Sequence, residues 1–334
     1  MIRVRDLAPL INLPTGSRNL VQAWVIECFR SDTPDVGLEF FGLQGSAKSS
    51  TQSMLRELVD PNEVNLRTNA NKREDIFVAC QSSLLVSYEN LSKLNTDRQD
   101  AFCTILTGGG YAARTMRTNV DETVINVKRP VVLNGIANVV TNPDLLDRFI
   151  SIELQKITAG KRKTEAELRA EFELKKAKIF GAILMRFSRS LQKLPEVAAQ
   201  KLELPRMSDF ALLGEAMMQS MGKDPGYFLA CYHRNQNRSV MRAIDSSPLG
   251  AAIVSYMSRN PGGLSGSYTQ ASDKLRAHAV SIAGQSFRAR DWPADNGEFG
   301  TALRRLIPAL ERNAIRVETA RKNIGFTCLI TRIT

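Results

Sequence analysis

The chain has 334 residues, of which 43% are hydrophobic, enough for two or three modest domains that each have a core. A formal net charge of +11 and an isoelectric point near 9.6 favour a polyanionic partner, and nucleic acid is the first candidate. Five scattered cysteines and only two histidines argue against both a disulfide framework and a zinc site.

No run of about eighteen apolar residues occurs, so the sequence predicts no membrane partner. The N-terminal residues place Asp6, Pro9 and Asn12 where a signal peptide would have its apolar core. We therefore expect a cytoplasmic protein with reduced cysteines.

The predicted elements begin with a helix over residues 17–32, for which Ser17 is a good N-cap. A strand follows at 36–42 (VGLEFFG), and then a helix over 49–60 that ends before a proline. Residues 82–90 (SSLLVSYEN) form a short apolar run of the kind that is buried in parallel sheets. The order strand, loop, helix, strand is typical of an α/β fold.

Residues 96–106 predict a further helix, which the glycine-rich TGGGY segment ends. The next segment alternates like a β-hairpin over 113–127, and apolar strands are predicted at 130–135 and 149–154. Helices that alternate with short apolar strands imply a sheet that is covered on both faces.

Beyond about residue 160 the pattern becomes helical, with one long amphipathic helix over 164–194 and shorter helices separated by prolines. Its predicted apolar face consists of Ile179, Phe180, Ile183, Leu184, Phe187 and Leu191. A last segment combines three helices with two β-like runs, which suggests a winged helix. The predicted domains are therefore a core over 1–157, an α-helical domain over 158–246 and a winged-helix DNA-binding domain over 247–334.

The segment EFFGLQGSAKSS, residues 39–50, nearly matches the phosphate-loop pattern G-x-x-x-x-G-K-[ST]. Backbone N–H groups and the helix dipole would hold phosphate oxygens, Lys48 would neutralise charge, and Ser49 would bind Mg²⁺. The predicted ATP contacts are Gly42, Gly45, Ser46, Ala47, Lys48, Ser49 and Ser50. The alternative is a chance glycine turn. Ala47 replaces the second glycine, at a cost of about 1–2 kcal/mol if its φ is positive.

Candidate catalytic residues follow the predicted strands. Glu89 would bind the metal's water shell and polarise the attacking water, but Asn90 follows it where a second carboxylate is usual. The residues therefore predict nucleotide binding and leave the rate of hydrolysis open. Asn134 could position the attacking water or simply start a turn, and Arg148 could reach a neighbouring subunit's γ-phosphate or be a surface arginine.

The combined spacing of the loop, YEN, TGGGYAAR, VVLNG and DLLDR resembles AAA+ ATPases, and within them the superfamily 3 helicases and primase-helicases of viruses and phages. The fold class implied is an α/β P-loop NTPase core followed by the helical domain and the winged helix. Alanine before the lysine also occurs in minichromosome-maintenance helicases, which hydrolyse ATP, so Ala47 is compatible with the resemblance.

The chain is also similar to ATP-binding, helicase-like proteins of phages, plasmids and integrated elements, in which segments like QGSAKS, TGGGY, PVVLNGI, DLLDR, PRMSDFA and LRRLIPAL recur in this order. This likeness covers most of the chain. Such proteins usually have further N-terminal domains, including primase-type ones, so we expect a helicase fragment that begins near the core.

The resemblance implies a homo-oligomeric ring, a hexamer, with ATP between subunits and Arg148 supplied by the neighbour. The hairpin would grip single-stranded DNA in the pore through Arg114 and Arg117, although Arg114 could instead contact the nucleotide or the subunit interface. In the terminal segment the basic candidates for DNA phosphates are Arg304, Arg305, Arg312, Arg316, Arg321, Lys322 and Arg332. A wing that binds protein is the alternative.

These features predict an ATP-driven helicase or translocase that acts on single-stranded DNA during replication of a mobile element. Two alternatives stay open. One is an ATP-binding module that loads or regulates DNA-bound partners with little hydrolysis, which the Glu89-Asn90 pair motivates. The other is a regulatory or defence ATPase whose winged helix contacts protein.

Overall fold

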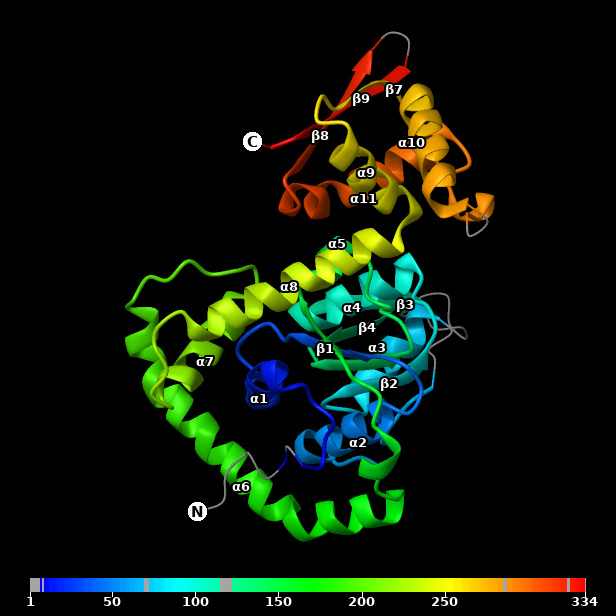
Figure 1. Ribbon diagram of the computed structural model, residues 1–334. Coiled ribbons are helices and arrows are strands. Elements are labelled where there is room, and N and C mark those ends of the chain that lie inside the picture. Colours follow the sequence, from blue (N-terminus) through cyan, green and yellow to red (C-terminus); the bar gives the residue numbers. More distant parts are fainter. Residues whose placement is uncertain are drawn as a thin grey trace. The chain divides into compact units, whose positions relative to one another are not determined.

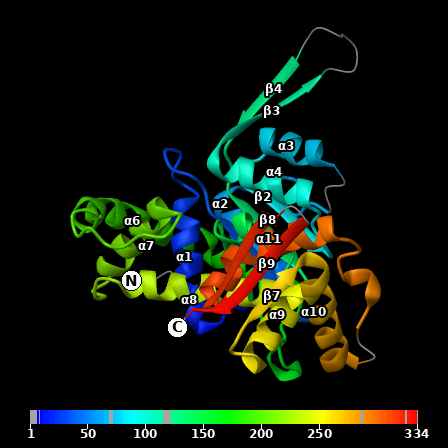
Figure 2. The same cartoon turned by 90° about the horizontal axis from the view of Figure 1, so that it is seen from above.

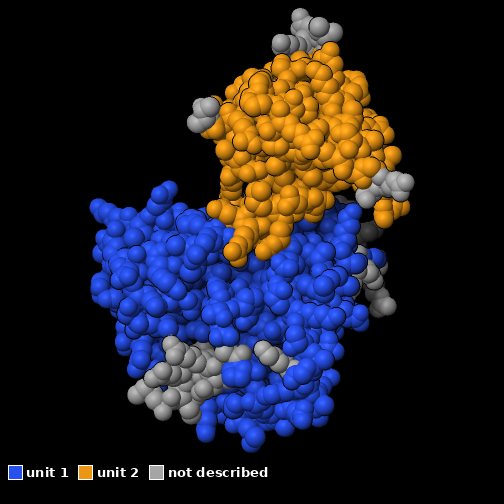
Figure 3. Space-filling model, viewed as in Figure 1, with its two compact units in different colours: residues 1–236 blue, residues 237–334 orange. Residues whose placement is uncertain are grey.

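The computed structural model describes residues 7, 9–68, 72–114, 122–284, 287–322 and 325–333. These residues divide into two compact units, 1–236 and 237–334, which Figure 3 shows in different colours. The boundary falls inside one long helix, α8 (Tyr227–Ser246). The division into three domains with boundaries near residues 157 and 246 stays a prediction.

A four-stranded parallel sheet lies at the centre of unit 1, with helices around it (Figure 1). Its order is β2 (Val86–Leu91), β5 (Val131–Gly135), β1 (Gly37–Phe41) and β6 (Phe149–Glu153). β1 and β5 are buried at every residue, because both are central strands of a covered parallel sheet. This confirms the predicted parallel α/β core.

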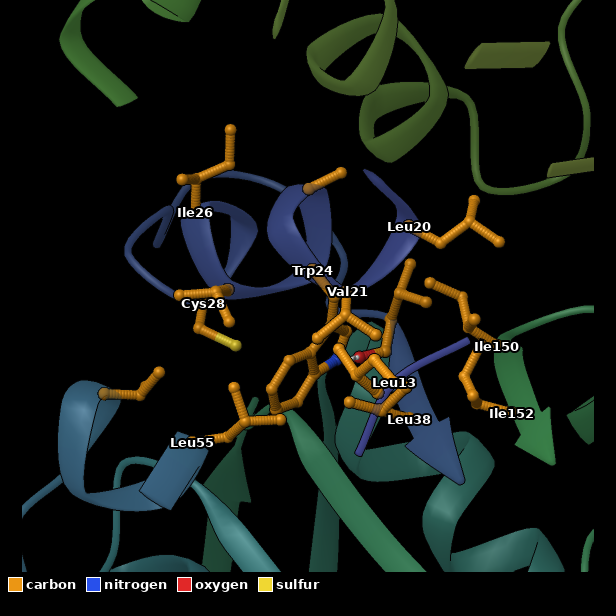
Figure 4. Close-up of a cluster of buried hydrophobic side chains, with 14 of the residues drawn as sticks. Leu13, Leu20, Val21, Trp24, Ile26, Cys28, Leu38, Leu55, Ile150 and Ile152 are labelled. Carbon is orange, nitrogen blue, oxygen red and sulfur yellow. Dashed lines mark hydrogen bonds between the residues drawn. The ribbon is translucent and has the colours of Figure 1, made fainter. Parts of the chain in front are cut away.

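The helices around this sheet include α1 (Arg18–Glu27), α2 (Lys48–Val59), α3 (Arg73–Gln81), α4 (Thr96–Thr107) and α5 (Pro143–Leu146). Figure 4 shows Trp24 of α1 among side chains of β1 and α2, and its Nε1 donates a hydrogen bond to Val36 O at 2.7 Å. Ser17 precedes α1 as predicted, but it closes a 3₁₀ turn (Thr15–Ser17) and its side chain makes no capping hydrogen bond.

The predicted hairpin consists of β3 (Gly109–Arg114) and β4 (Glu122–Val127), which pair antiparallel and extend away from the sheet (Figure 2). The long predicted helix is α6 (Glu165–Ala198), which begins with a capping box between Thr164 and Glu167.

Helices α6 and α7 (Ser208–Gln219) bury their apolar residues in the same cluster as the sheet. Phe172, Ile179 and Phe210 belong to one hydrophobic cluster with Leu38 of β1. On the predicted apolar face of α6, Ile183 is buried as well, whereas Phe180, Leu184 and Leu191 are exposed. The sheet and the helical segment are therefore stabilised by one shared core.

Among its described residues, unit 2 contains the end of α8, three further α-helices and a three-stranded antiparallel sheet, with a core of its own. Its elements, in chain order, are α9 (Pro248–Arg259), β7 (Leu264–Ser267), α10 (Tyr268–Ala283), α11 (Asn296–Arg312), β8 (Ile315–Lys322) and β9 (Gly325–Arg332). Strand β7, with sequence LSGS, is a strand that the sequence did not predict, because a short serine and glycine run has almost no β-propensity. Its pairing with β9 provides the order β7-β9-β8.

Candidate functional site

The 42–49 loop consists of the segment between β1 and α2 together with the first two residues of α2. Gly42 has φ 144°, and a Cβ atom there would lie 2.3 Å from Leu154 O, so only glycine fits. Gly45 has φ 81°. Ala47 has φ 57° and ψ 36°, the left-handed conformation whose cost for alanine is about 1–2 kcal/mol.

Lys48 is the first residue of α2, and its ammonium lies within the loop. Nζ donates hydrogen bonds to Gly42 O at 2.8 Å, to Leu43 O at 3.2 Å and to Ser46 Oγ at 3.4 Å. Partial burial lowers the pKa of the Lys48 ammonium below its usual range. The loop thus combines a half-buried positive charge with the N-terminus of a twelve-residue helix, an arrangement that attracts anions.

The remaining predicted contacts lie in the same turn. Ser46 is buried, whereas Ser49 and Ser50 are half-buried in the first turn of α2. A hydroxyl at the Ser49 position is the group that binds Mg²⁺ in phosphate loops. The residues present therefore fit a nucleotide phosphate with its cation.

Asn12 connects the loop to the N-terminal segment, a role that no pattern in the sequence predicted. Its Nδ2 donates to Ser46 O at 2.9 Å and to Gln155 O at 2.7 Å. Ile157 N donates to Gly45 O at 3.1 Å. The loop is therefore held between two segments that are distant in sequence, and such contacts follow only from the tertiary fold.

A cavity of about 640 Å³ opens beside the loop. It is lined by residues of the 9–13 segment, by Gly45, Ala47 and Ser50 of the loop and α2, and by the segment that leads into α6. Its charged lining residues are Arg18, Lys156, Arg162, Lys163 and Glu165. Four cations against one carboxylate make the cavity suited to an anionic ligand of nucleotide size.

Asn134 and Asn90 are brought together at the ends of β5 and β2. Asn134 is fully buried, its Oδ1 accepts from Asn90 N at 2.9 Å, and its Nδ2 donates to Gln52 Oε1 at 2.6 Å. Asn90 has φ 55°, and the pairing of β2 with β5 shifts register between Tyr88 and Leu91. Asn134 therefore supports the backbone that follows Glu89.

Gln52 is a residue of this site that the sequence analysis missed. It follows Lys48 by one helical turn, and its Nε2 donates to Ser87 Oγ at 2.8 Å and to Tyr88 O at 3.1 Å. Its position four residues after Lys48, on the same face of the predicted helix, is the feature of the sequence that could have identified it. Glu89 itself is half-buried, and its backbone N donates to Arg67 O at 2.8 Å.

Arg148 is paired inside its own chain. Its Nη1 donates to Asp144 O at 2.8 Å and forms an ion pair with the Asp144 carboxylate, and only 9% of the residue is exposed. Burial raises the pKa of Asp144, but hydrogen bonds from Arg148 and Cys103 and the charge of Arg206 outweigh it and hold that pKa below its usual value. Contact with a neighbouring subunit stays a prediction.

The predicted DNA contacts are spread over both units. The backbone of Arg114 pairs with Glu122 in the hairpin, and Arg117 lies outside the described residues. Arg304 and Arg305 are exposed on α11. The Arg321 guanidinium lies 5.8 Å from the centre of the Phe326 ring.

Phe326 in turn stacks on Tyr268 with ring centres 5.5 Å apart, so an aromatic pair supports Arg321. The backbone of Lys322 ends β8. Of the other basic candidates in this segment, Arg312, Arg316 and Arg332 are exposed.

Two absences concern the described residues alone. They contain no group of three or more His, Cys, Asp or Glu side chains placed to hold a metal ion. None of the described helices combines the length and apolar character that crossing a bilayer requires.

Comparison with known proteins gives one clear family and several weak structural likenesses. Over 98% of this chain and 74% of that one, the apo C-terminal region of NrS-1 aligns at 12% identity with a TM-score of 0.44. JCV helicase aligns at 13% identity with a TM-score of 0.34, over 71% of this chain and 64% of that one. No curated protein matches this chain.

The family comparison is decisive because it covers most of the chain. Residues 4–228 match the model of the actinomycete integrative conjugative element replication protein. Residues 249–333 match the model of the AICE RepA C-terminal domain. The chain therefore belongs to the family of replication proteins of actinomycete integrative conjugative elements.

Proposed function

We propose that this replication protein is an ATP-driven helicase or translocase of the AAA+ class, related to superfamily 3, that acts on single-stranded DNA as a ring. The observation that carries the proposal is the conformation of the 42–49 loop. This loop joins a central parallel strand to a helix N-terminus, two of its glycines have positive φ, and Lys48 Nζ lies inside it. Membership of a replication family and a net charge of +11 support DNA as the partner.

In this proposal the residues of the loop bind the phosphates. Lys48 neutralises charge on the β- and γ-phosphate oxygens, and the N–H groups of the loop and of the first turn of α2 donate hydrogen bonds to them. Ser49 and Glu89 would hold Mg²⁺, which when bound would supply positive charge beside the phosphates. Glu89 also polarises the attacking water.

The Gln52 and Asn134 amides take a supporting part. Together they fix the backbone of Asn90, and hence the direction in which Glu89 leaves β2. Arg148 would be supplied to the neighbouring subunit's site, which requires it to leave its ion pair with Asp144 when the ring, a hexamer in our proposal, assembles.

Unit 2 would act as a winged helix on DNA. Its element order, α9, β7, α10, α11, β8, β9, supports this proposal, and α11 presents Arg304 and Arg305 to solvent. The β3–β4 hairpin would grip single-stranded DNA in the pore through Arg114 and Arg117. DNA contact by both parts would make binding depend on salt.

Steady-state phosphate release with single-stranded DNA present tests the proposal. Lys48→Ala should abolish release, whereas Lys193→Ala, which removes a half-buried α6 lysine paired with Glu196, should leave it unchanged. Equal release by the unmodified chain and Lys48→Ala would overturn the proposal.

Mixing two inactive variants tests the role of Arg148. A Lys48→Ala subunit retains Arg148 and an Arg148→Ala subunit retains Lys48, so a mixed ring contains some complete sites. We expect mixtures to regain part of the activity. Full activity of Arg148→Ala alone, or no recovery on mixing, would contradict a contribution from the neighbour.

One second candidate has a specific observation in its favour. Glu89 is followed by Asn90 in the left-handed conformation, so the site has a single carboxylate where a pair is usual. A module that binds ATP and loads or regulates DNA-bound partners with little hydrolysis would need no more. Tight ATP binding without phosphate release above background would favour this candidate.

A further inference from the structure

Arg162 lies against the 42–49 loop, although it belongs to the segment that leads into α6. Its Nη2 lies 2.9 Å from where a Cβ atom on Gly45 would stand. Its Nε donates to Ile157 O at 3.3 Å, and Ile157 N donates to Gly45 O at 3.1 Å. Two successive hydrogen bonds therefore tie the guanidinium to the backbone of the loop.

The charge of Arg162 is uncommitted, unlike that of its neighbour in sequence. Lys163 forms an ion pair with Glu171. Within the part of the chain that the structure describes, Arg162 forms no ion pair, and Ile157 O is the acceptor that its side chain contacts. An arginine has five N–H donors, so both Nη groups stay available to oxygens of a ligand.

The cationic side chains around the cavity beside Arg162 favour an anionic ligand. Arg18 and Lys156 also line it, and the Arg18 Nε is buried without a hydrogen-bond partner. A ligand with several negative oxygens would offset the repulsion among these cations. Lys48 approaches the same loop from its interior, so the two basic groups would lie on one phosphate chain.

We propose that Arg162 is a phosphate ligand of the bound nucleotide, supplied by the same subunit that supplies Lys48. The inference rests on the proposed function, because it names a second residue of that nucleotide site. Arginine suits this place because its planar fork matches two phosphate oxygens at once. Since Arg162 lies two residues before Thr164, which begins the capping box of α6, phosphate binding would also fix the start of that helix.

Competition against a fluorescent mant-ATP probe tests this, with adenosine, ADP and ATP as competitors. Arg162→Ala should weaken ATP binding by about 10- to 100-fold and ADP binding by less, while adenosine binding stays unchanged. Arg162→Lys should recover part of the loss, because it restores charge without the fork. Arg189→Ala, at an exposed arginine farther along α6, should match the unmodified chain.

The outcomes separate the two proposals. If the unmodified chain does not bind mant-ATP, or binds it equally after Lys48→Ala, the proposed function fails and the inference falls with it. If binding depends on Lys48 but Arg162→Ala and Arg162→Gln both bind ATP normally, the inference alone fails. An equal loss for adenosine and ATP would assign Arg162 to the packing of the cavity and would also overturn the inference.

Discussion

Ala47 is the residue at which the sequence departs from the usual phosphate loop, and it adopts the left-handed conformation that glycine adopts freely. Alanine at this position therefore destabilises the folded state, because its Cβ methyl group is strained in the left-handed conformation. Alanine also reduces the conformational freedom of the unfolded chain, which offsets part of this cost.

We expect Ala47→Gly to raise the free energy of unfolding by up to about 1 kcal/mol, because relief of the left-handed strain exceeds the added entropy of the unfolded chain. Urea denaturation of both chains measures this difference. A lower unfolding midpoint for Ala47→Gly at an unchanged m-value would contradict the strain that we assign to Ala47.

Asn134 illustrates how much of the site the sequence could specify. Its place at the end of a strand, near Glu89-Asn90, was predicted from the order of the motifs. The sequence could not show that both ends of its amide are engaged, since Gln52 reaches it from a helix eighty-two positions away. Tertiary contacts of this kind leave no local pattern.

Gln52→Leu should lower the rate of phosphate release by roughly 10- to 100-fold while ATP affinity changes little, because Asn134 and Asn90 would lose their support but the 42–49 loop would not. Stopped-flow nucleotide binding and steady-state turnover separate the two effects. A folded Gln52→Leu chain with normal turnover would show that the amide pair does not position Glu89.

At the scale of elements, apolar runs predicted β1, β5 and β6 well, because strands buried on both faces are apolar at successive positions. The sequence did not predict β7, whose pairing with β9 depends on tertiary context. It also predicted an apolar face on α6 that is only partly buried in the structure. The Asn12 contacts that fasten the loop were also invisible to any local pattern.

The end of α1 contains a buried acid. Glu27 is 2% exposed and accepts a hydrogen bond from Thr33 Oγ1 at 2.7 Å. Burial raises its pKa to about 7, although the Thr33 hydrogen bond and Arg30 lower it in part. Burial likewise raises the pKa of Asp35 to about 7, against the effect of Lys128.

These raised pKa values set the sign of a pH dependence. Between the ordinary carboxyl pKa and about pH 7 the folded chain binds more protons than the unfolded chain, so stability falls as pH rises and the fall ends above pH 7. Glu27→Gln mimics the protonated acid and should be more stable than the unmodified chain at pH 8, by on the order of 1–3 kcal/mol, but not at pH 5. Urea denaturation across this range measures it, and equal pH slopes in both chains would refute it.

The arginines of helix α11 lead to a prediction about how duplex DNA binding depends on salt. Arg304 and Arg305 are one position apart and exposed, so the double variant to alanine should reduce the salt slope of duplex binding by about 2, roughly one for each phosphate contact. Fluorescence anisotropy over a salt series measures the slope, with Arg276→Ala on α10 as the control. An unchanged slope would favour a wing that contacts protein.

At the scale of the whole molecule, family membership establishes a replication protein of a mobile element, and the 42–49 loop is the feature that turns this into a chemical proposal. The basic charge of the chain and the two basic surfaces predicted for DNA are consistent with a motor, but each could also serve a passive binding protein. Coupling of ATP turnover to movement along DNA separates these possibilities.

The most direct measurement is displacement of a labelled strand from a forked duplex. We predict displacement by the unmodified chain with ATP, and none with a non-hydrolysable analogue or with Lys48→Ala. Displacement that proceeds equally with Lys48→Ala or without hydrolysis would contradict an ATP-driven motor, as would DNA-stimulated hydrolysis that never separates the strands.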